Sequence, residues 1–442
     1  EMRYLHERRK ELGGSLPSRK PDFEALTVPG IDSLEAVTKG TGKREISTTM
    51  AFVRVLSALI KDKEIGKRVV PIVPDEARTF GMEGMFRQLG IYSSAGQLYE
   101  PSDSSQVMYY REDIDGQVME EGINEGGAFA AWLAAATSYT NNDYPLIPFY
   151  VFYSMFGFQR VGDLCWAAGD LQARGFLIGG TAGRTTLNGE GLQHQDGHSH
   201  ILAGTVPNCV TYDPTYGYEL AVIIQHGLQE MYVDMKAKYY YITVMNENYI
   251  QPAMPKGCEE GIIKGMYLLK KNSKKSSRKV VQLLGSGTIL REVVEAAAIL
   301  KTDFDVDADV WSATSFNELR RDGLITSRWN MLHPEETPRQ SFVEECLEGA
   351  KGPVVASTDY MKSYADQIRE FISGTYTVLG TDGFGRSDTR ERLRHFFEVD
   401  RYFIVVAALT ALVEDNVVDV GQVAAAIKRF GIDPEKVNPA LS

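Results

Sequence analysis

The sequence has no long hydrophobic run and few cysteines. No uninterrupted apolar stretch in its 442 residues approaches the roughly 20 needed to cross a bilayer, so a membrane-spanning helix is not expected. The charged start, Glu1–Lys10, is unlike a signal peptide. The four cysteines lack the paired spacing of a zinc site or a disulfide framework: Cys165, Cys209, Cys258 and Cys346. These absences predict a protein of the reducing cytoplasm.

Positive charge is scarce as well. Lys and Arg total 47 against 59 Asp and Glu, which gives a formal net charge of −12. Nucleic acids and acidic membranes attract basic surfaces, so neither is expected as a partner. A hydrophobic content of 43% and a charged content of 24% are ordinary for a globular protein, and the length allows two or three domains. Small molecules and proteins are the favoured partners.

The spacing of apolar residues predicts an α/β fold. Residues 1–45 are rich in charge, Gly and Pro and are expected to form an arm or linker without a core of its own. From Ser47 onward, predicted helices and strands alternate to residue 243, and the alternation restarts at Val280 after a basic, Ser-rich segment. This pattern predicts two doubly wound, mainly parallel sheets, in domains that span 46–254 and 255–442.

Glu125 is a lone carboxylate at the start of an Ala-rich helix predicted over 126–138. The aromatic strand predicted over 146–153 follows closely. Burial beside aromatic surface disfavours the charged form of a carboxyl group, so its pKa rises toward the range for proton exchange with a bound heterocycle. A solvated acid stabilised by the helix dipole explains the same position. The local sequence leaves both interpretations open.

Three of the seven histidines lie in one Gly-rich loop, at His194, His198 and His200, with Asp196 nearby. A His-x-His pair with an acid is compatible with a zinc site. The absence of regular ligand geometry favours polar groups that orient a substrate or move protons. Another turn, Gly285-Ser-Gly287, lacks the full phosphate-binding fingerprint and is expected to be structural.

Polar residues also follow the short strand predicted near 68–74. Asp75 and Glu76 come directly after it, and α/β proteins gather functional side chains beyond the carboxyl ends of their strands. The stretch from Tyr92 to Gln117 is polar with little periodicity. Such a long segment is typical of an active-site lid or a disordered loop.

Five segments together closely resemble one family, the homodimeric, thiamine-diphosphate-dependent decarboxylating component of the bacterial pyruvate dehydrogenase complex, a relative of transketolase. The resemblance runs from the arm to the last helix. The segments are Asp75-Glu-Ala-Arg-Thr-Phe-Gly-Met-Glu-Gly84, Glu121-Gly-Ile-Asn-Glu125, Tyr153-Ser-Met-Phe-Gly-Phe-Gln-Arg160, Leu187-Asn-Gly-Glu-Gly-Leu-Gln-His194 and Gly380-Thr-Asp-Gly-Phe-Gly-Arg-Ser387.

The resemblance implies three domains, which bind the cofactor's diphosphate, bind its pyrimidine, and form a transketolase-type C-terminal domain. Residues 46–254 resemble the second and residues 255–442 the third. The Gly-Asp-Gly motif of the first domain is missing, because Gly162-Asp-Leu164 and Gly169-Asp-Leu171 both differ at the third position. The chain is therefore expected to be a fragment without its own ligands for Mg²⁺ and diphosphate.

The resemblance also implies roles for single residues. Glu125 matches the glutamate that activates the cofactor by sharing a proton with its aminopyrimidine, and Phe156 matches the ring that stacks on it. Tyr153 and His194 match groups that line the pocket for the substrate carboxylate and the adduct oxygen. Three further positions match substrate-pocket or pocket-edge residues: His200, Asp75 and Glu76. The stretch 94–112 matches a mobile active-site loop.

In this family the cofactor lies between two subunits. The resemblance therefore implies a homodimer that decarboxylates pyruvate oxidatively and transfers the acetyl group to the lipoyl domain of the dihydrolipoyl acetyltransferase. The fragment alone is expected to bind thiamine diphosphate weakly and to be inactive. A transketolase, another 2-oxoacid decarboxylase and a non-catalytic dimerisation or docking module remain alternatives, although no basic cluster for a sugar phosphate is evident.

Overall fold

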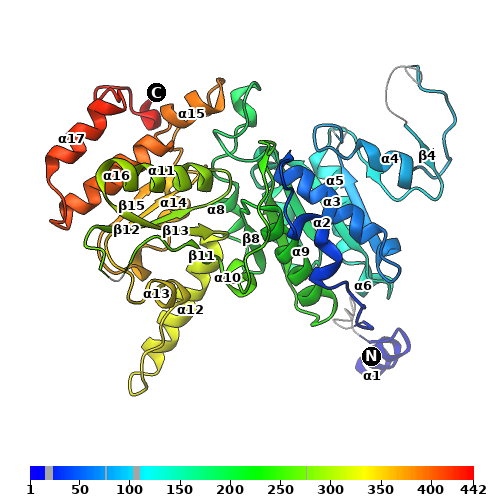
Figure 1. The fold of residues 1–442 in the computed structure, drawn as a ribbon. Coiled ribbons are helices and arrows are strands. Elements are labelled where there is room, and N and C mark those ends of the chain that lie inside the picture. Colours follow the sequence, from blue (N-terminus) through cyan, green and yellow to red (C-terminus); the bar gives the residue numbers. More distant parts are fainter. Residues whose placement is uncertain (15–22, 75–76, 103–109, 275) are drawn as a thin grey trace.

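A computed structural model describes residues 1–14, 23–74, 77–102, 110–274 and 276–442. Its two halves lie side by side, each built around one sheet (Figure 1). Asp75 and Glu76 lie outside the described residues, as does the middle of the predicted lid. Within the described residues, no helix is both long and apolar enough to cross a membrane.

The first sheet has six strands in the order β5-β2-β6-β7-β9-β8, and all neighbouring pairs are parallel. This confirms the predicted parallel sheet. The strands are β2 (Val69–Val73), β5 (Met119–Glu120), β6 (Ile147–Tyr153), β7 (Phe176–Gly180), β8 (Cys209–Tyr212) and β9 (Tyr239–Thr243).

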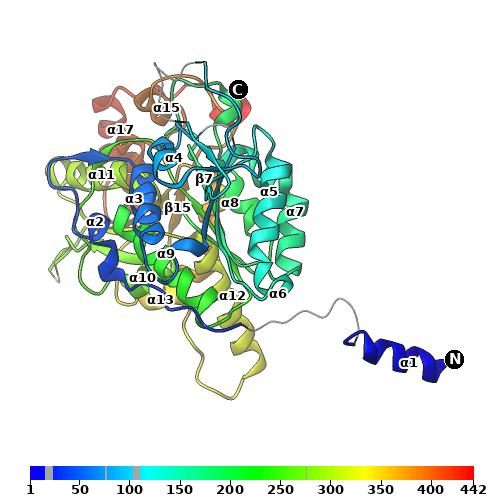
Figure 2. The same ribbon diagram turned by 90° about the vertical axis from the view of Figure 1, so that its right-hand side faces the viewer.

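Helices cover both faces of this sheet because successive strand residues point to opposite sides. Phe149 and Val151 of β6 pack toward α3 (Thr48–Ile60) and α9 (Gly217–Tyr232). Tyr150 and Phe152 pack toward α5 (Glu125–Ala136) and α7 (Phe158–Asp170). Figure 2 shows α5 and α7 together on one side of the strands and α3 and α9 on the other. The continuous apolar run of β6 is thus explained by burial on both faces.

The second sheet has five strands in the order β11-β13-β12-β14-β15. Only its edge strand β11 is antiparallel. One face packs on α11 (Ile289–Phe304) and α16 (Arg401–Glu414), and the other on α12 (Phe316–Leu332) and α14 (Lys362–Asp366). The strands are β11 (Met266–Lys270), β12 (Val280–Gly285), β13 (Asp307–Ala313), β14 (Val354–Ser357) and β15 (Tyr376–Leu379).

Side-chain caps fix where several helices begin. Ser47 accepts a hydrogen bond from the Met50 N–H at 3.1 Å, and Asn124 accepts one from the Gly127 N–H at 3.0 Å. Each cap satisfies a backbone donor that the first helical turn leaves unpaired. The Asn124 cap therefore makes Glu125 the first residue of α5.

The N-terminal arm has more local structure than expected. It contains α1 (Met2–Glu11), η1 (Ile31–Leu34) and α2 (Glu35–Thr38). Leu34 and Val37 are buried in the hydrophobic core of the first sheet, so the described part of the arm packs against that core and has none of its own. The remaining short elements are β1 (Glu45–Ile46), η2 (Gly66–Arg68), α4 (Glu83–Leu89), β3 (Ile91–Tyr92), β4 (Glu112–Asp113), α6 (Ser138–Asn141), η3 (Ser154–Phe156), η4 (Leu192–His194), α8 (Ser199–Ala203), β10 (Tyr249–Ile250), α10 (Glu259–Lys264), α13 (Phe342–Leu347), η5 (Arg369–Phe371), α15 (Arg390–Phe396), α17 (Val420–Arg429) and η6 (Pro439–Leu441).

Candidate functional site

Glu125 pairs with an arginine that also contacts an aromatic ring just beyond the carboxyl end of β6. Its carboxylate accepts a hydrogen bond from Arg160 Nη1 at 2.7 Å, and its side chain is 17% exposed. The central guanidinium carbon of Arg160 lies 4.0 Å from the centroid of the Phe156 ring. One planar cation thus contacts both the acid and the aromatic face.

Two further rings complete this group. The centroids of His194 and Tyr153 are 5.3 Å apart, and those of His194 and Phe156 are 5.0 Å apart. The Nδ1 atom of His194 is buried without a hydrogen-bond partner among the described residues. We call Glu125, Tyr153, Phe156, Arg160 and His194 the Glu125 cluster. The fold brings together four residues predicted from the sequence and adds Arg160.

The second half of the molecule supports the loop that carries His194. The Arg386 backbone N–H donates to Gln195 Oε1 at 2.7 Å, and the Ser387 hydroxyl donates to the Glu190 carbonyl at 2.8 Å. Gly385 approaches the loop so closely that a β-carbon there would clash with the Leu192 carbonyl. The segment 380–387 is therefore a support for the His194 loop rather than an independent site.

His200 has a different environment. It is fully buried, and its Nε2 lies 3.0 Å from Thr243 Oγ1. Its ring stacks on Tyr364 at 4.8 Å and meets the edge of Tyr360 at 4.8 Å. Burial lowers the pKa of His200 to about 3, so its imidazole is neutral at physiological pH. The side chain of His200 contacts Thr243, Tyr360 and Tyr364, none of which belongs to the Glu125 cluster, so its substrate role stays a prediction.

The zinc interpretation of the histidine loop finds no support. His198 Nε2 lies 2.8 Å from Gln159 Oε1, while His194 and His200 have the separate partners given above. Over the parts of the chain that the structure describes, no group of three or more His, Cys, Asp or Glu side chains is arranged to hold a metal ion. The three histidines therefore lie in three different environments.

A second polar group lies where the two sheets meet. The Asp359 carboxylate accepts hydrogen bonds from the Thr185 N–H at 2.8 Å, the Thr185 hydroxyl at 2.6 Å and the Thr186 N–H at 3.1 Å. Asp213 accepts one from the Thr243 hydroxyl at 2.8 Å, and its Oδ2 has no hydrogen-bond partner in the described structure. We call Asp213 and Asp359, with the threonines that contact them, the buried seam.

Burial dominates the electrostatics of this seam. It raises the pKa of Asp213 to about 7, and the nearby Asp359 adds to the shift. It also raises the pKa of Asp359. The turn Gly285-Ser-Gly287 belongs to the seam, because the Gly287 N–H donates to the Asp213 carbonyl at 3.2 Å. Gly287 has a φ of +49°, and a β-carbon there would lie 2.7 Å from Asp213 Oδ2. The turn is structural, as predicted.

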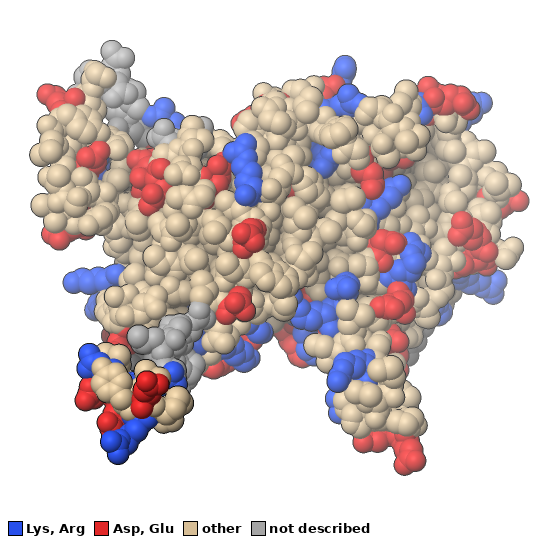
Figure 3. Space-filling view, turned by 180° about the vertical axis from the view of Figure 1, so that it is seen from behind, with Lys and Arg blue, Asp and Glu red and all other residues tan. Residues whose placement is uncertain are grey.

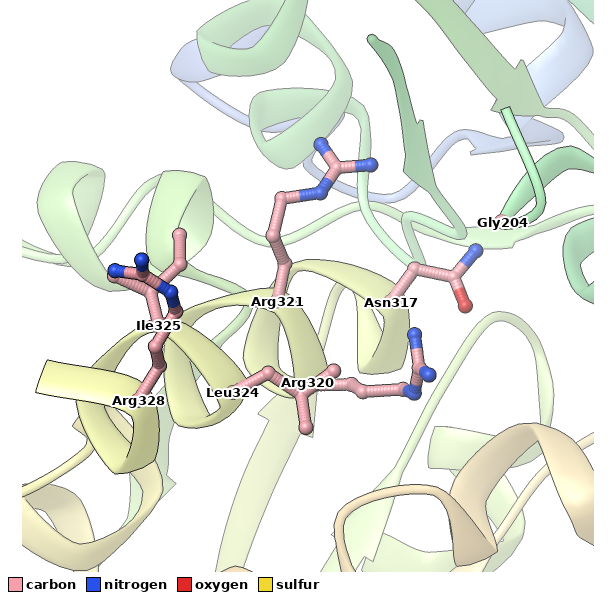
Figure 4. A pocket seen from close by; sticks show the side chains of 7 residues that line it. All are labelled: Gly204, Asn317, Arg320, Arg321, Leu324, Ile325 and Arg328. Carbon is pink, nitrogen blue, oxygen red and sulfur yellow. The ribbon is translucent and has the colours of Figure 1, made fainter. Parts of the chain in front are cut away.

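A separate pocket of about 250 Å³ lies at the start of α12 (Figure 4). Arg321 donates to the Cys209 carbonyl at 3.0 Å, whereas Arg320 is exposed. The pocket lies beside α8, because Gly204 ends that helix and Asn317 donates a hydrogen bond to the His200 carbonyl at 2.8 Å. None of its lining residues was predicted from the sequence. Its lining residues are Gly204, Asn317, Arg320, Arg321, Leu324, Ile325 and Arg328.

Sequence reasoning did not single out Arg160, Asp213 or Asp359. Asp213 follows β8 directly, so the strand-end argument applied to Asp75 would have found it. Arg160 lies four residues after Phe156, but a turn of η3 and the start of α7 separate them. Its pairing with Glu125 depends on how these elements fold back.

Two family profiles match the chain. The profile for the pyruvate dehydrogenase E1 component middle domain matches residues 26–252, and that for the transketolase-like C-terminal domain matches residues 265–400. The pyruvate dehydrogenase E1 component of Pseudomonas aeruginosa is 66% identical over 440 residues, which cover 99% of this chain and 50% of that protein. Its counterpart in Escherichia coli K12 is 59% identical over 445 residues, which cover 100% and 50%. The chain spans about half the length of these curated relatives.

Solved transketolases share the fold. The enzyme from Campylobacter jejuni aligns with a TM-score of 0.61 at 18% identity, over 91% of this chain and 50% of that one. A split-gene transketolase, described as an inactive β4 tetramer, aligns with a TM-score of 0.56 at 15% identity, over 83% of this chain and 98% of that one. At these identities the likeness shows the fold alone, and it confirms the predicted transketolase-type α/β architecture.

Proposed function

The chain belongs to the pyruvate dehydrogenase E1 family, and from this premise we propose that it provides the aminopyrimidine-binding part of a thiamine-diphosphate site that decarboxylates pyruvate. One observation carries the proposal. Glu125 and Phe156, from separate elements, contact the same planar group, the guanidinium of Arg160.

Arg160 provides a test of whether these residues fit the cofactor. Its guanidinium is planar, donates an N–H to the Glu125 carboxylate and stacks on the Phe156 ring. An aminopyrimidine is also a planar nitrogen-bearing group that needs a carboxyl partner on its edge and an aromatic ring on its face. The two residues therefore fit it. We infer that the pyrimidine takes the place of the guanidinium and that Arg160 moves aside.

The chain's own residues have distinct tasks in the proposed reaction. When bound, thiamine diphosphate supplies the nucleophilic carbon that attacks the 2-oxo carbon of pyruvate. The Glu125 carboxyl oxygen would exchange a proton with the aminopyrimidine of the bound cofactor. Tyr153 and His194 present a hydroxyl and an imidazole beside Phe156, where donors hold the substrate carboxylate and stabilise charge that develops on oxygen.

The finer assignments are part of the same proposal. They comprise reductive acetylation of the lipoyl group of the dihydrolipoyl acetyltransferase, a homodimer in the cytoplasm, and domain limits at 46–254 and 255–442. The ligands for Mg²⁺ and for the diphosphate come from residues other than these 442, so the chain alone is inactive. The proposal also keeps Asp75, Glu76 and His200 as residues of the substrate pocket. It is supported by the identity to relatives about twice as long.

A substrate comparison tests this function. The full-length enzyme that contains this sequence is assayed for pyruvate-dependent reduction of an artificial electron acceptor and for ketol transfer from a ketose phosphate. We expect turnover of pyruvate and none of the ketose phosphate, because the Glu125 cluster contains no lysine and a single arginine, which is paired with Glu125. Efficient ketol transfer would identify a transketolase instead.

A further inference from the structure

A pocket of about 550 Å³ lies between the two halves, on elements that the Glu125 cluster does not use. Its volume is within the range of small-molecule sites. Four arginines line it, from α11, α15 and α16, together with loop residues of the first half. The full lining is Asn188, Glu247, Arg291, Glu292, Arg390, Glu391, Arg394, Asp400, Arg401 and Tyr402.

Two acidic residues are already shared among three of these arginines. Glu247 accepts a hydrogen bond from Arg291 at 2.6 Å and also pairs with Arg394. Glu292 holds Arg401 through two hydrogen bonds, from Nε at 2.8 Å and from Nη2 at 3.0 Å. A carboxylate that is engaged in this way has little capacity left for another cation.

The other acids are engaged or peripheral. The Asp400 carboxylate caps α16 by accepting hydrogen bonds from the Tyr402 and Phe403 N–H groups, both at 2.9 Å, and it pairs with His395 at 2.9 Å. Glu391 is exposed. Within the described part of the chain, neither forms an ion pair with an arginine of the pocket.

Arg390 lies outside the ion pairs that Glu247 and Glu292 form with the other three arginines. Its Nε donates to the Thr186 carbonyl at 2.6 Å, and within the described residues no carboxylate forms an ion pair with it. Burial lowers the pKa of Arg390, and the positive charges of Arg394 and Arg291 lower it further against the opposing effect of Glu247. An anion in the pocket would relieve this repulsion.

Arg394 provides a second observation. Its side chain is only 6% exposed, and its Nε is buried without a hydrogen-bond partner. A buried donor without a partner is destabilising, so a ligand that accepts a hydrogen bond there is stabilising. α11, which contains 16 residues, also begins beside the pocket, and helix N-termini favour anions.

We propose that this pocket binds a small phosphate-bearing anion, with Arg390 as the main contact and Arg394 as a buried donor behind it. A phosphate suits the site better than a single carboxylate because guanidinium forks bind its several oxygens. By comparison, the face of the molecule in Figure 3 carries interspersed acidic and basic residues.

The pocket also adjoins the segment that carries His194. Asn188 lines the pocket, and Arg390 binds the carbonyl of Thr186, two residues earlier. Anion binding is therefore expected to stabilise the start of the His194 loop. The proposal itself concerns binding and does not rest on the proposed decarboxylase activity.

Calorimetric titration of the 442-residue chain at low salt tests the proposal, with inorganic phosphate and adenosine 5′-monophosphate as separate probes. We expect one site per chain, and binding weakened about tenfold or more by Arg390→Ala, since a hydrogen bond to a charged group contributes about 1.5–3 kcal/mol. Equal affinities would show that phosphate alone is recognised, and tighter nucleotide binding would show a contribution from the rest of the nucleotide, such as contact with Tyr402. Both results support the site.

Arg320→Ala is the matched control, because Arg320 is an exposed arginine of another pocket (Figure 4). It is expected to leave binding unchanged. Should Arg390→Ala fail to fold, Arg390→Lys keeps the charge, loses the fork and is expected to weaken binding by a smaller factor. Absence of binding by both probes, or an equal loss in Arg320→Ala, would overturn the proposal. Neither result bears on the Glu125 cluster.

Discussion

The Glu125 cluster and the buried seam arise by the same rule and differ in burial. Both form where parallel strands end, at β6 and β7 in the first case and at β8, β9, β12 and β14 in the second. Glu125 is paired with an arginine whose side chain is 49% exposed. Asp213 and Asp359 are fully buried between the two halves.

This difference separates a candidate active site from a structural joint. A carboxylate that an exposed arginine can leave is available to a ligand, whereas Asp359 already accepts hydrogen bonds from two threonines of the opposite half. Where the carboxyl edge of one sheet packs against the carboxyl edge of the other, the polar groups at that edge form hydrogen bonds with each other and are not available to a ligand. Strand-end polar residues therefore indicate function only where no other part of the molecule covers them.

The largest effect is expected from Asp359→Ala. The substitution removes the acceptor of several buried donors, and we expect the free energy of unfolding to fall by about 3–5 kcal/mol. Urea denaturation of the 442-residue chain measures it. Asp163→Ala, on an exposed position of α7, is the control and is expected to change stability by less than about 0.5 kcal/mol. Similar stabilities of the two variants would show that the seam is not a structural joint.

Glu125→Gln, in contrast to Asp359→Ala, should reduce turnover strongly and stability only slightly. The amide keeps the shape of the side chain but cannot exchange a proton, so pyruvate turnover by the full-length enzyme is expected to fall about 100-fold or more. Because the Glu125–Arg160 pair is partly exposed, unfolding should change by less than about 1 kcal/mol. Paired assays of turnover and urea unfolding check both statements. Retained turnover would remove Glu125 from the proposed chemistry.

The pH dependence of stability sharpens the same contrast. The pKa of Asp213 is raised to about 7 in the folded protein and is about 3.9 in an unfolded chain, so the folded state binds the extra proton between these values. The contribution of Asp213 is full below about pH 4 and is lost as the pH rises toward 7, with a slope of at most about 1.4 kcal/mol per pH unit.

Asp213→Asn should remove this slope, because an amide does not titrate. Urea unfolding of wild type and variant between pH 5 and pH 8 provides the measurement, with Asp163→Asn as the exposed control. Parallel stability curves for wild type and Asp213→Asn would contradict the assignment of a raised pKa to this carboxyl group.

Arg160→Ala is expected to give the smallest effect. Its ion pair is about half exposed and contributes at most about 1 kcal/mol to stability. If the guanidinium competes with the pyrimidine, its removal should strengthen thiamine binding by a few-fold, since up to about 1 kcal/mol of competition is relieved. Competition titrations compare it with Arg328→Ala on α12. Weaker binding in Arg160→Ala would show that Arg160 is a ligand contact rather than a competitor.

Much of the fold could be predicted because apolar periodicity is a local property. The aromatic run at β6 and the cap-and-helix pattern at Ser47 each predict an element without reference to the rest of the chain. α12 was missed because its sequence is polar, with Gly323 in its interior. Its burial against the second sheet outweighs that low propensity.

The candidate site could be predicted only in part. The family resemblance indicated Glu125, Tyr153, Phe156 and His194, and the structure brings these four together. The pairing of Arg160 with Glu125 joins residues 35 positions apart through a turn whose geometry no spacing rule specifies. The seam depends on docking of the two halves, which is a long-range property. Asp75 and Glu76 lie outside the described residues, so their roles stay predictions.

Ligand-observed saturation-transfer NMR on the 442-residue chain with thiamine tests most directly whether Glu125 and Phe156 form a pyrimidine site, since it detects weak binding. The account predicts stronger transfer to the pyrimidine protons than to the thiazolium protons, a large loss of transfer in Phe156→Ala, and no loss in Arg320→Ala. Equal transfer to both rings, or transfer that Phe156→Ala leaves unchanged, would contradict it.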